Sequence, residues 1–365
     1  MSLQTLVNVV PDDRWDAFLA STPGGSHKQT SSWARVKALQ GWRARRIVMH
    51  DETGERVLGG AQILVRPLPV AGFAGRIGYV VKGPLVMERD PVLQARLLHE
   101  IDQLCRAERI SVIIVQPPED APPFDSSLLD HGYIPSPLSL APTSPVVVDL
   151  DADIDVLRQR LGKQLRRNIR RAEAAGVVVR HGVRADLDDF YRLLTVASQR
   201  QRYRIFPQAY YERIWDEFSP KGGAQLFVAE LDGQIVSIQL CVTFRRTMFS
   251  KALAWSGQHR GVSVNDALDW NTIAWARAHG IEYYDLESIS DDLARRMLDG
   301  GEPTTSEMRG SDAYKLKWSR RVVMFPPPYL RVTNPVLRGV VRRAPERLMT
   351  SALRELRARF RPLAG

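Results

Sequence analysis

Two short stretches of the chain carry residue types that could do chemistry. Residues 258–263 (QHRGVS) lie between an expected strand and an expected helix over 265–279. A glycine-containing loop at a helix N-terminus can offer backbone N–H groups to a phosphate, and the plainer alternative is an ordinary turn. Asp285 and Glu287 end the strand that follows. They are candidates for a general base, and structural carboxylates are the commoner alternative.

Several common catalytic arrangements are missing from the sequence. The seven histidines form no convincing catalytic pair, and there is no nucleophile elbow of a Ser-His-Asp hydrolase. Cys105 and Cys241 are far apart and belong to no CxxC or Cys/His cluster. This argues against a disulfide scaffold and a structural zinc site, and it fits a reducing compartment.

The positive charge of the chain is concentrated in two segments. The 365 residues include 51 Lys+Arg and 41 Asp+Glu, which gives a formal net charge of +10. Residues 331–365 hold nine arginines and two glutamates, and residues 158–171 hold seven basic residues and no acid. Apolar residues recur mostly every four positions in 158–171, which predicts an amphipathic helix. Its basic face is either a solvated surface or a contact for an anionic partner.

The elements that must position these residues occur twice along the chain. A strand, a glycine turn, a second strand, a helix and a third strand are expected over 46–115 and again over 225–286. The two copies are too far apart in sequence for a solenoid repeat. We therefore predict an α/β (α+β) fold of two tandem units, each a mixed β-sheet flanked by helices.

The first unit is expected over 1–146, with 320–340 returning to it, and the second over 147–319. A basic C-terminal helix is expected over 341–365, which either lies on an anionic membrane surface or packs against the protein. No apolar run is long enough to span a bilayer, and the first residues lack the pattern of a cleaved signal. The expectation is a cytoplasmic protein, with peripheral contact at the inner face of the plasma membrane as a conjecture.

Six stretches occur in an order that is typical of one family. They are residues 29–37 (QTSSWARVK), 78–85 (GYVVKGPL), 163–172 (KQLRRNIRRA), 226–230 (LFVAE), 314–318 (YKLKW) and 328–335 (PYLRVTNP). In this order the chain resembles the Fem family of peptidoglycan interpeptide-bridge aminoacyltransferases, in its short form without a helical arm. The resemblance implies two tandem GNAT-like (acyl-CoA N-acyltransferase-like) domains. It also implies transfer of an amino acid from aminoacyl-tRNA to the stem-peptide amine of a peptidoglycan precursor, lipid-linked or UDP-linked, with no cofactor and no metal.

The resemblance also implies roles for individual residues. Lys315 is the candidate catalytic cation for the oxyanion, and its plainer alternative is a surface lysine in a strand. The supporting and substrate-binding candidates beside it are Tyr314, Lys317 and Trp318. The diphosphate of the acceptor requires separated cations at a domain cleft, and the candidates are Lys37 with Trp33, and Arg202 and Arg204. The tRNA phosphates would meet the basic helix at Lys163, Arg166, Arg167, Arg170 and Arg171.

Two other functions stay open. The 258–263 loop resembles a degraded pyrophosphate loop of acetyl-CoA-dependent N-acetyltransferases, with Ser263 at its last small position. An acyl-CoA-dependent N-acyltransferase, with acetyl-CoA as co-substrate, is therefore one alternative. The stretch 285–319 departs from the family pattern near the expected acceptor site, so a non-catalytic RNA- or membrane-binding relative is the other. A monomer is the expected state.

Overall fold

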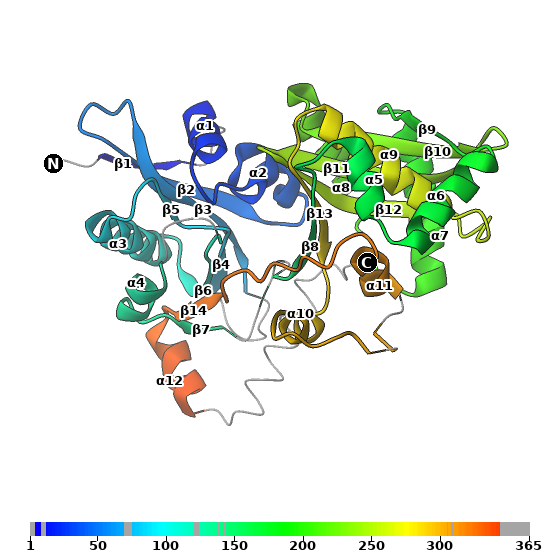
Figure 1. Ribbon diagram of the computed structural model, residues 1–365. Helices are drawn as coiled ribbons and strands as arrows, with labels where there is room; N and C mark the ends of the chain where they lie inside the picture. Colours follow the sequence, from blue (N-terminus) through cyan, green and yellow to red (C-terminus); the bar gives the residue numbers. More distant parts are fainter. Residues whose placement is uncertain are drawn as a thin grey trace. The chain divides into compact units, whose positions relative to one another are not determined.

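The computed structural model describes residues 4–8, 12–68, 75–119, 124–136, 139, 141, 143–304, 306–307 and 310–343. The chain forms two compact units (Figure 1). The first unit comprises the chain up to Ala141 together with a second segment that begins at Phe325. The second unit comprises Pro142–Met324. None of the described helices is both long and apolar enough to cross a bilayer.

The first unit is built on one mixed sheet. Its strand order is β1-β2-β3-β4-β6-β14-β7, with β5 paired to β3, and only β4 and β6 run parallel. The strands are β1 Gln4–Asn8, β2 Arg43–His50, β3 Val57–Pro67, β4 Arg76–Val81, β5 Leu85–Val86, β6 Ile110–Gln116, β7 Ile134–Pro135 and β14 Tyr329–Val332. The helices are α1 Asp13–Ser21, η1 His27–Gln29, α2 Ser31–Ala38, α3 Pro91–Ala107, α4 Asp125–Asp130 and α12 Pro335–Arg343.

The core of the first unit follows the two-residue period of its strands. Ile47 and Met49 of β2 share one face with Ala61 and Ile63 of β3, and this face packs against the apolar side of α3. Gly60 is required by close packing, because a Cβ there would lie 2.7 Å from the Trp15 ring.

The second unit is built on a six-stranded sheet in the order β8-β13-β12-β11-β10-β9. Its neighbours are antiparallel except β12 and β13, which run parallel. The strands are β8 Pro145–Asp149, β9 Val178–His181, β10 Ala224–Leu231, β11 Gln234–Phe244, β12 Thr247–Trp255 and β13 Tyr283–Ser288. The helices are α5 Ile154–Arg160, α6 Lys163–Ala174, α7 Asp186–Gln201, α8 Gln208–Phe218, η2 Ser219–Lys221, α9 Val264–Ala278, α10 Asp291–Leu298 and α11 Gly310–Leu316.

The predicted repeat is confirmed, and so is the fold class. In each unit three antiparallel strands lead into a helix and then a strand parallel to the last of the three, β2-β3-β4-α3-β6 and β10-β11-β12-α9-β13. Each parallel strand then gains an antiparallel neighbour from a distant part of the chain. β14 takes this place beside β6, and β8 takes it beside β13.

The basic segment 158–171 differs from the single helix that its period predicts. It is divided between α5 and α6, because Leu161 adopts an extended conformation and Gly162 is the N-cap of α6. Leu161 itself is buried in the core together with Leu165 and Ile169. The apolar period therefore continues across the break while the backbone does not. Of the basic C-terminal helix predicted over 341–365, residues from 344 onward lie outside the described part of the chain.

Candidate functional site

The candidate site lies where the two parallel strands of the second unit part. β12 and β13 pair from Thr247 with Tyr283 to Phe249 with Asp285. Beyond these residues β12 continues to Trp255 and β13 to Ser288 with no further pairing between them. Side chains rather than backbone hydrogen bonds must therefore fill the opening between the strands.

Lys251 enters this opening from a β-bulge in β12. Ser250 pairs with Cys241 and Ala252 with Leu240, so Lys251 is an extra residue with no partner on β11. Bulges re-aim side chains and are common beside active sites. The Lys251 side chain is 8% exposed, and its Nζ forms an ion pair with Glu287. Glu287 has a φ of 64°, a conformation uncommon for glutamate, and β13 shifts its register against β8 at the same point.

The structure brings three of the predicted residues to this opening. Asp285 Oδ1 accepts a hydrogen bond from the Glu287 N–H at 2.6 Å. Lys315 Nζ donates to the Ser288 carbonyl oxygen at 2.8 Å. Burial lowers the pKa of Lys315, while the nearby carboxylates of Glu287, Asp312 and Asp285 oppose this shift. We call Lys251, Asp285, Glu287 and Lys315 the opening cluster.

Lys315 lies on helix α11 and not on a strand. The helix is joined to the sheet by a buried polar network centred on Asp269 of α9, which is fully buried. Its carboxylate accepts hydrogen bonds from Gln239 Nε2 at 2.8 Å, from the Tyr284 hydroxyl at 2.8 Å and from the Tyr314 hydroxyl. Burial raises the pKa of Asp269, and these donors counter the rise. Tyr314, predicted to contact substrate, thus directs its hydroxyl to this network.

Lys317 joins α11 to α9 at a second point. Its Nζ pairs with the buried carboxylate of Asp266 and lies 3.7 Å from the centroid of the Tyr314 ring. Asp266 also accepts a hydrogen bond from Asn168 of α6 at 2.8 Å. The lysine next but one to Lys315 therefore links three helices.

The basic face of α6 contains two kinds of cation. Lys163, Arg167 and Arg170 are exposed. Arg166 instead donates to the carbonyl oxygens of Gln159 at 2.6 Å and Leu161 at 2.8 Å, across the break before α6. Arg171 donates to the carbonyl oxygen of Gly261 at 3.1 Å. Four of the five predicted tRNA contacts, all but Arg166, are thus exposed, while Arg166 and Arg171 also donate to backbone carbonyl oxygens.

In the first unit, Lys37 and Trp33 lie together on α2. Lys37 Nζ is 5.7 Å from the centroid of the Trp33 ring and contacts Gln40 Oε1. Burial, aided by the positive charges of Lys28 and Arg66, lowers the pKa of Lys37 to about 7. The other two acceptor candidates, Arg202 and Arg204, are exposed residues of the second unit that follow α7.

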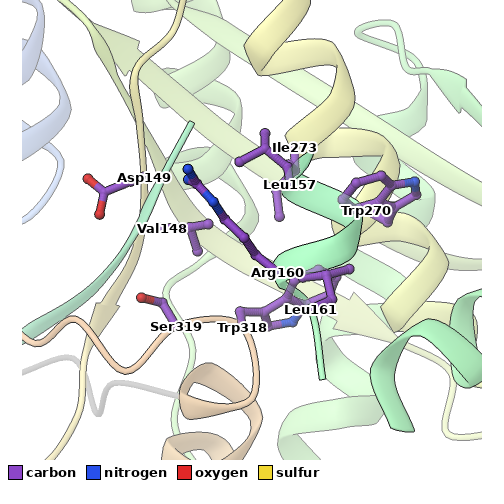
Figure 2. A pocket seen from close by; sticks show the side chains of 9 residues that line it. All are labelled: Val148, Asp149, Leu157, Arg160, Leu161, Trp270, Ile273, Trp318 and Ser319. Carbon is purple, nitrogen blue, oxygen red and sulfur yellow. The ribbon is translucent and has the colours of Figure 1, made fainter. Parts of the chain in front are cut away.

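A small pocket of about 180 Å³ also lies in the second unit (Figure 2). It is lined by Val148, Asp149, Leu157, Arg160, Leu161, Trp270, Ile273, Trp318 and Ser319. Trp318, predicted to support Lys315, lines this pocket, and Lys315 does not. In the described part of the chain, no group of three or more His, Cys, Asp or Glu side chains could hold a metal ion.

Sequence reasoning missed Lys251 and Asp269. Lys251 is the one charged residue of its strand, and Asp269 with Asp266 interrupts the apolar face of α9. Charges in such positions are rarely buried unless they are paired, so each was a detectable signal.

Comparison with known proteins shows what the chain is similar to. Residues 10–127 match the model of the FemAB family, and residues 159–316 match that of a GNAT acetyltransferase domain. A Staphylococcus aureus protein named "Lipid II:glycine glycyltransferase" is 27% identical over 233 residues, which is 61% of this chain and 54% of that protein. These matches confirm the resemblance of the chain to the Fem family.

Solved structures show a fold shared with this chain. The crystal structure of FemX superposes with a TM-score of 0.79 at 19% identity, over 92% of this chain and 99% of that one. A tandem GNAT protein from the clavulanic acid biosynthesis pathway superposes with a TM-score of 0.53 at 14% identity, over 92% and 99% of the two chains. The tandem GNAT-like fold is thus shared. The chain spans about half the length of the curated relatives it matches.

The Lys251–Glu287 pair should stabilise the fold. Lys251→Met removes the buried lysine of the Lys251–Glu287 ion pair, which should lower the free energy of unfolding by up to about 3 kcal/mol. Arg246→Met is the matched control, because Arg246 forms an exposed ion pair with Glu282 near the start of the same two strands. Its cost should stay below about 1 kcal/mol in urea denaturation. Equal losses in both variants would contradict a structural role for the buried pair.

Lys37 should make stability depend on pH. Its folded pKa is about 7, whereas an unfolded lysine titrates near about 10.4. Between these values the unfolded chain binds the extra proton, so this residue's contribution to stability rises with pH across the window. The stability difference between the wild type and Lys37→Met should therefore shift in favour of the wild type from pH 7 to pH 9. A constant difference in urea titrations would mean that Lys37 has an ordinary pKa.

Proposed function

We propose that the chain is an aminoacyltransferase that moves an amino acid from aminoacyl-tRNA to the stem-peptide amine of a peptidoglycan precursor. The match of residues 10–127 to the FemAB family model and the name of the similar glycyltransferases support this proposal. The observation that carries it is the opening cluster, in which two lysines and two carboxylates meet where β12 and β13 part. Acyl transfer from an activated ester needs cations for the oxyanion and acceptors for protons, and both are present there.

The chemistry would proceed as follows at these residues. The neutral amine attacks the ester carbonyl, the new C–N bond forms, and the ribose oxygen leaves as the ester C–O bond breaks. Lys315, held by the Ser288 carbonyl, is aimed to stabilise the oxyanion. Because burial lowers its pKa, its ammonium is also a better proton donor to the leaving oxygen. Asp285 or Glu287 would accept the proton that the amine loses.

The donor and acceptor would be bound by separate groups of cations. The exposed Lys163, Arg167 and Arg170 suit the phosphates of the tRNA acceptor stem, without sequence readout. The diphosphate of the acceptor would be held by cations among Lys37, Arg202 and Arg204. The proposed enzyme needs no cofactor, because aminoacyl-tRNA is already activated. It would act as a cytoplasmic monomer, in peripheral contact with the membrane where lipid-linked precursors lie.

Lys315→Ala should lower kcat while leaving tRNA affinity nearly unchanged. Loss of one oxyanion donor typically costs about 10²–10³ in kcat. The measurement is extension of a lipid- or UDP-linked muropeptide by a mixed pool of charged tRNA, read by mass spectrometry. Lys221→Ala, an exposed lysine on η2, is the control.

Unchanged turnover in Lys315→Ala would remove Lys315 from the mechanism. No extension by the wild type with any amino acid would contradict the proposed function. Measurable binding of acetyl-CoA in isothermal titration would favour the acyl-CoA alternative.

The exposed cations of α6 should set the salt dependence of tRNA binding. Replacing Lys163, Arg167 and Arg170 by Gln should reduce the slope of log affinity against log salt by roughly 2 to 3, at roughly 0.7–0.9 for each lost phosphate contact. The charge-matched control replaces three exposed arginines of the first unit, Arg56, Arg89 and Arg106. If both triple variants changed the slope equally, α6 would have no special part in RNA binding.

A further inference from the structure

The small pocket of the second unit is walled by core side chains. Its apolar lining belongs to the hydrophobic core of this unit and consists of Val148, Leu157, Leu161, Trp270, Ile273 and Trp318. Protein cores are close-packed and hold few voids larger than a water molecule. An apolar cavity of about 150 Å³ is large enough to bind benzene. A pocket of about 180 Å³ therefore has room for one branched aliphatic side chain or one aromatic ring.

Two side chains of opposite charge also line the pocket. Arg160 is 52% exposed and Asp149 is 37% exposed, so both reach solvent. In Figure 2 the Arg160 guanidinium and the Asp149 carboxylate lie to the left of the two indole rings. Arg160 pairs with Asp151 at 2.8 Å, and Asp149 pairs with Arg321. Exposed ion pairs contribute little to stability, so either group can exchange its partner for a ligand.

The two indole rings are held by their surroundings. Trp270 lies under the Arg158 guanidinium, whose Cζ is 5.7 Å from the ring centroid and which also pairs with Glu173. Trp318 is buried and lies two residues beyond the end of α11. Because Trp270 directly follows Asp269 in α9, the pocket borders both helices that the Asp269 network joins. A preformed apolar pocket with a few placed polar groups is typical of a small-molecule site.

We propose that this pocket binds a free α-amino acid with an apolar side chain the size of leucine or phenylalanine. The side chain packs against the two indole rings, the α-carboxylate accepts hydrogen bonds from Arg160, and the α-ammonium donates to Asp149. A guanidinium fork matches a carboxylate, and the two opposite charges match a zwitterion. A nucleobase fits less well, because its edges need several neutral donors and acceptors and the lining side chains offer the Ser319 hydroxyl. This binding goes beyond the proposed transfer reaction and does not depend on it.

The test measures binding of L-leucine and of two analogues that each lack one charge, by tryptophan fluorescence of the full chain. The analogue 3-methylbutylamine lacks the carboxylate, and 4-methylpentanoate lacks the ammonium. Arg160→Gln should weaken binding of leucine by roughly 10- to 100-fold, the range for hydrogen bonds to a charged group, and leave that of 3-methylbutylamine unchanged. Asp149→Asn should weaken binding of leucine to a similar extent and leave that of 4-methylpentanoate unchanged.

Two further variants control for charge and for the cavity. Arg184→Gln is the matched control, because Arg184 forms an exposed ion pair with Asp216 in the same unit, and it should keep the wild-type affinity. Val148→Phe should fill the pocket and abolish leucine binding without lowering the melting temperature. Because Arg160 is exposed, Arg160→Gln tests the site even if Val148→Phe melts at a lower temperature.

Three results would overturn the proposal. They are no saturable binding of leucine up to about 10 mM, equal losses of affinity in Arg160→Gln and Arg184→Gln, and binding of glycine as tight as that of leucine. Saturable binding of adenosine in place of leucine would assign the pocket to a nucleobase instead. The transfer assay is separate: its failure in the wild type refutes the proposed function, while leucine binding that depends on Arg160 and Asp149 would still stand.

Discussion

The brief pairing of β12 and β13 is the constraint on which the candidate site depends. Two parallel strands that stop pairing leave backbone groups and space that something else must satisfy. Here the bulge directs the Lys251 side chain into that space, where it forms an ion pair with Glu287, a residue with positive φ. The Ser288 carbonyl oxygen accepts a hydrogen bond from Lys315. Each of these features would be strained or costly in a continuous sheet. Together, these charged side chains take the place of backbone hydrogen bonds between the two strands.

The buried polar network around Asp269 explains how the charged side chains of the opening cluster are held in place. Asp269 cannot be buried without donors, and its donors come from β11, β13 and α11. The same carboxylate therefore fixes the helix that carries Lys315 relative to the strand that carries Glu287. Lys317 and Asp266 add a second link from α11 to α9. The position of Lys315 is thus set by buried polar contacts between its helix and the core of the second unit.

Local signals made the repeated architecture predictable. Glycine turns, apolar alternation and helical periods lie within short windows, and they predicted both copies of the unit. The break between α5 and α6 escaped because Leu161 keeps the apolar period while its backbone is extended. Lys251 escaped for another reason, because its bulge depends on the register with β11. Family resemblance led to Lys315, and the end of a predicted strand led to Asp285 and Glu287. Neither signal could reveal the lysine that pairs with Glu287.

The place of β14 between β6 and β7 has a consequence for synthesis of the chain. Both neighbours are made before the second unit, and β14 is made after it. During synthesis on the ribosome, the edge of β6 that later pairs with β14 therefore stays unpaired while about two hundred further residues are added. Such an edge can pair with another chain. The second sheet has no such wait, because β8 precedes β13. The first unit, whose synthesis begins first, is therefore the unit whose sheet is completed last.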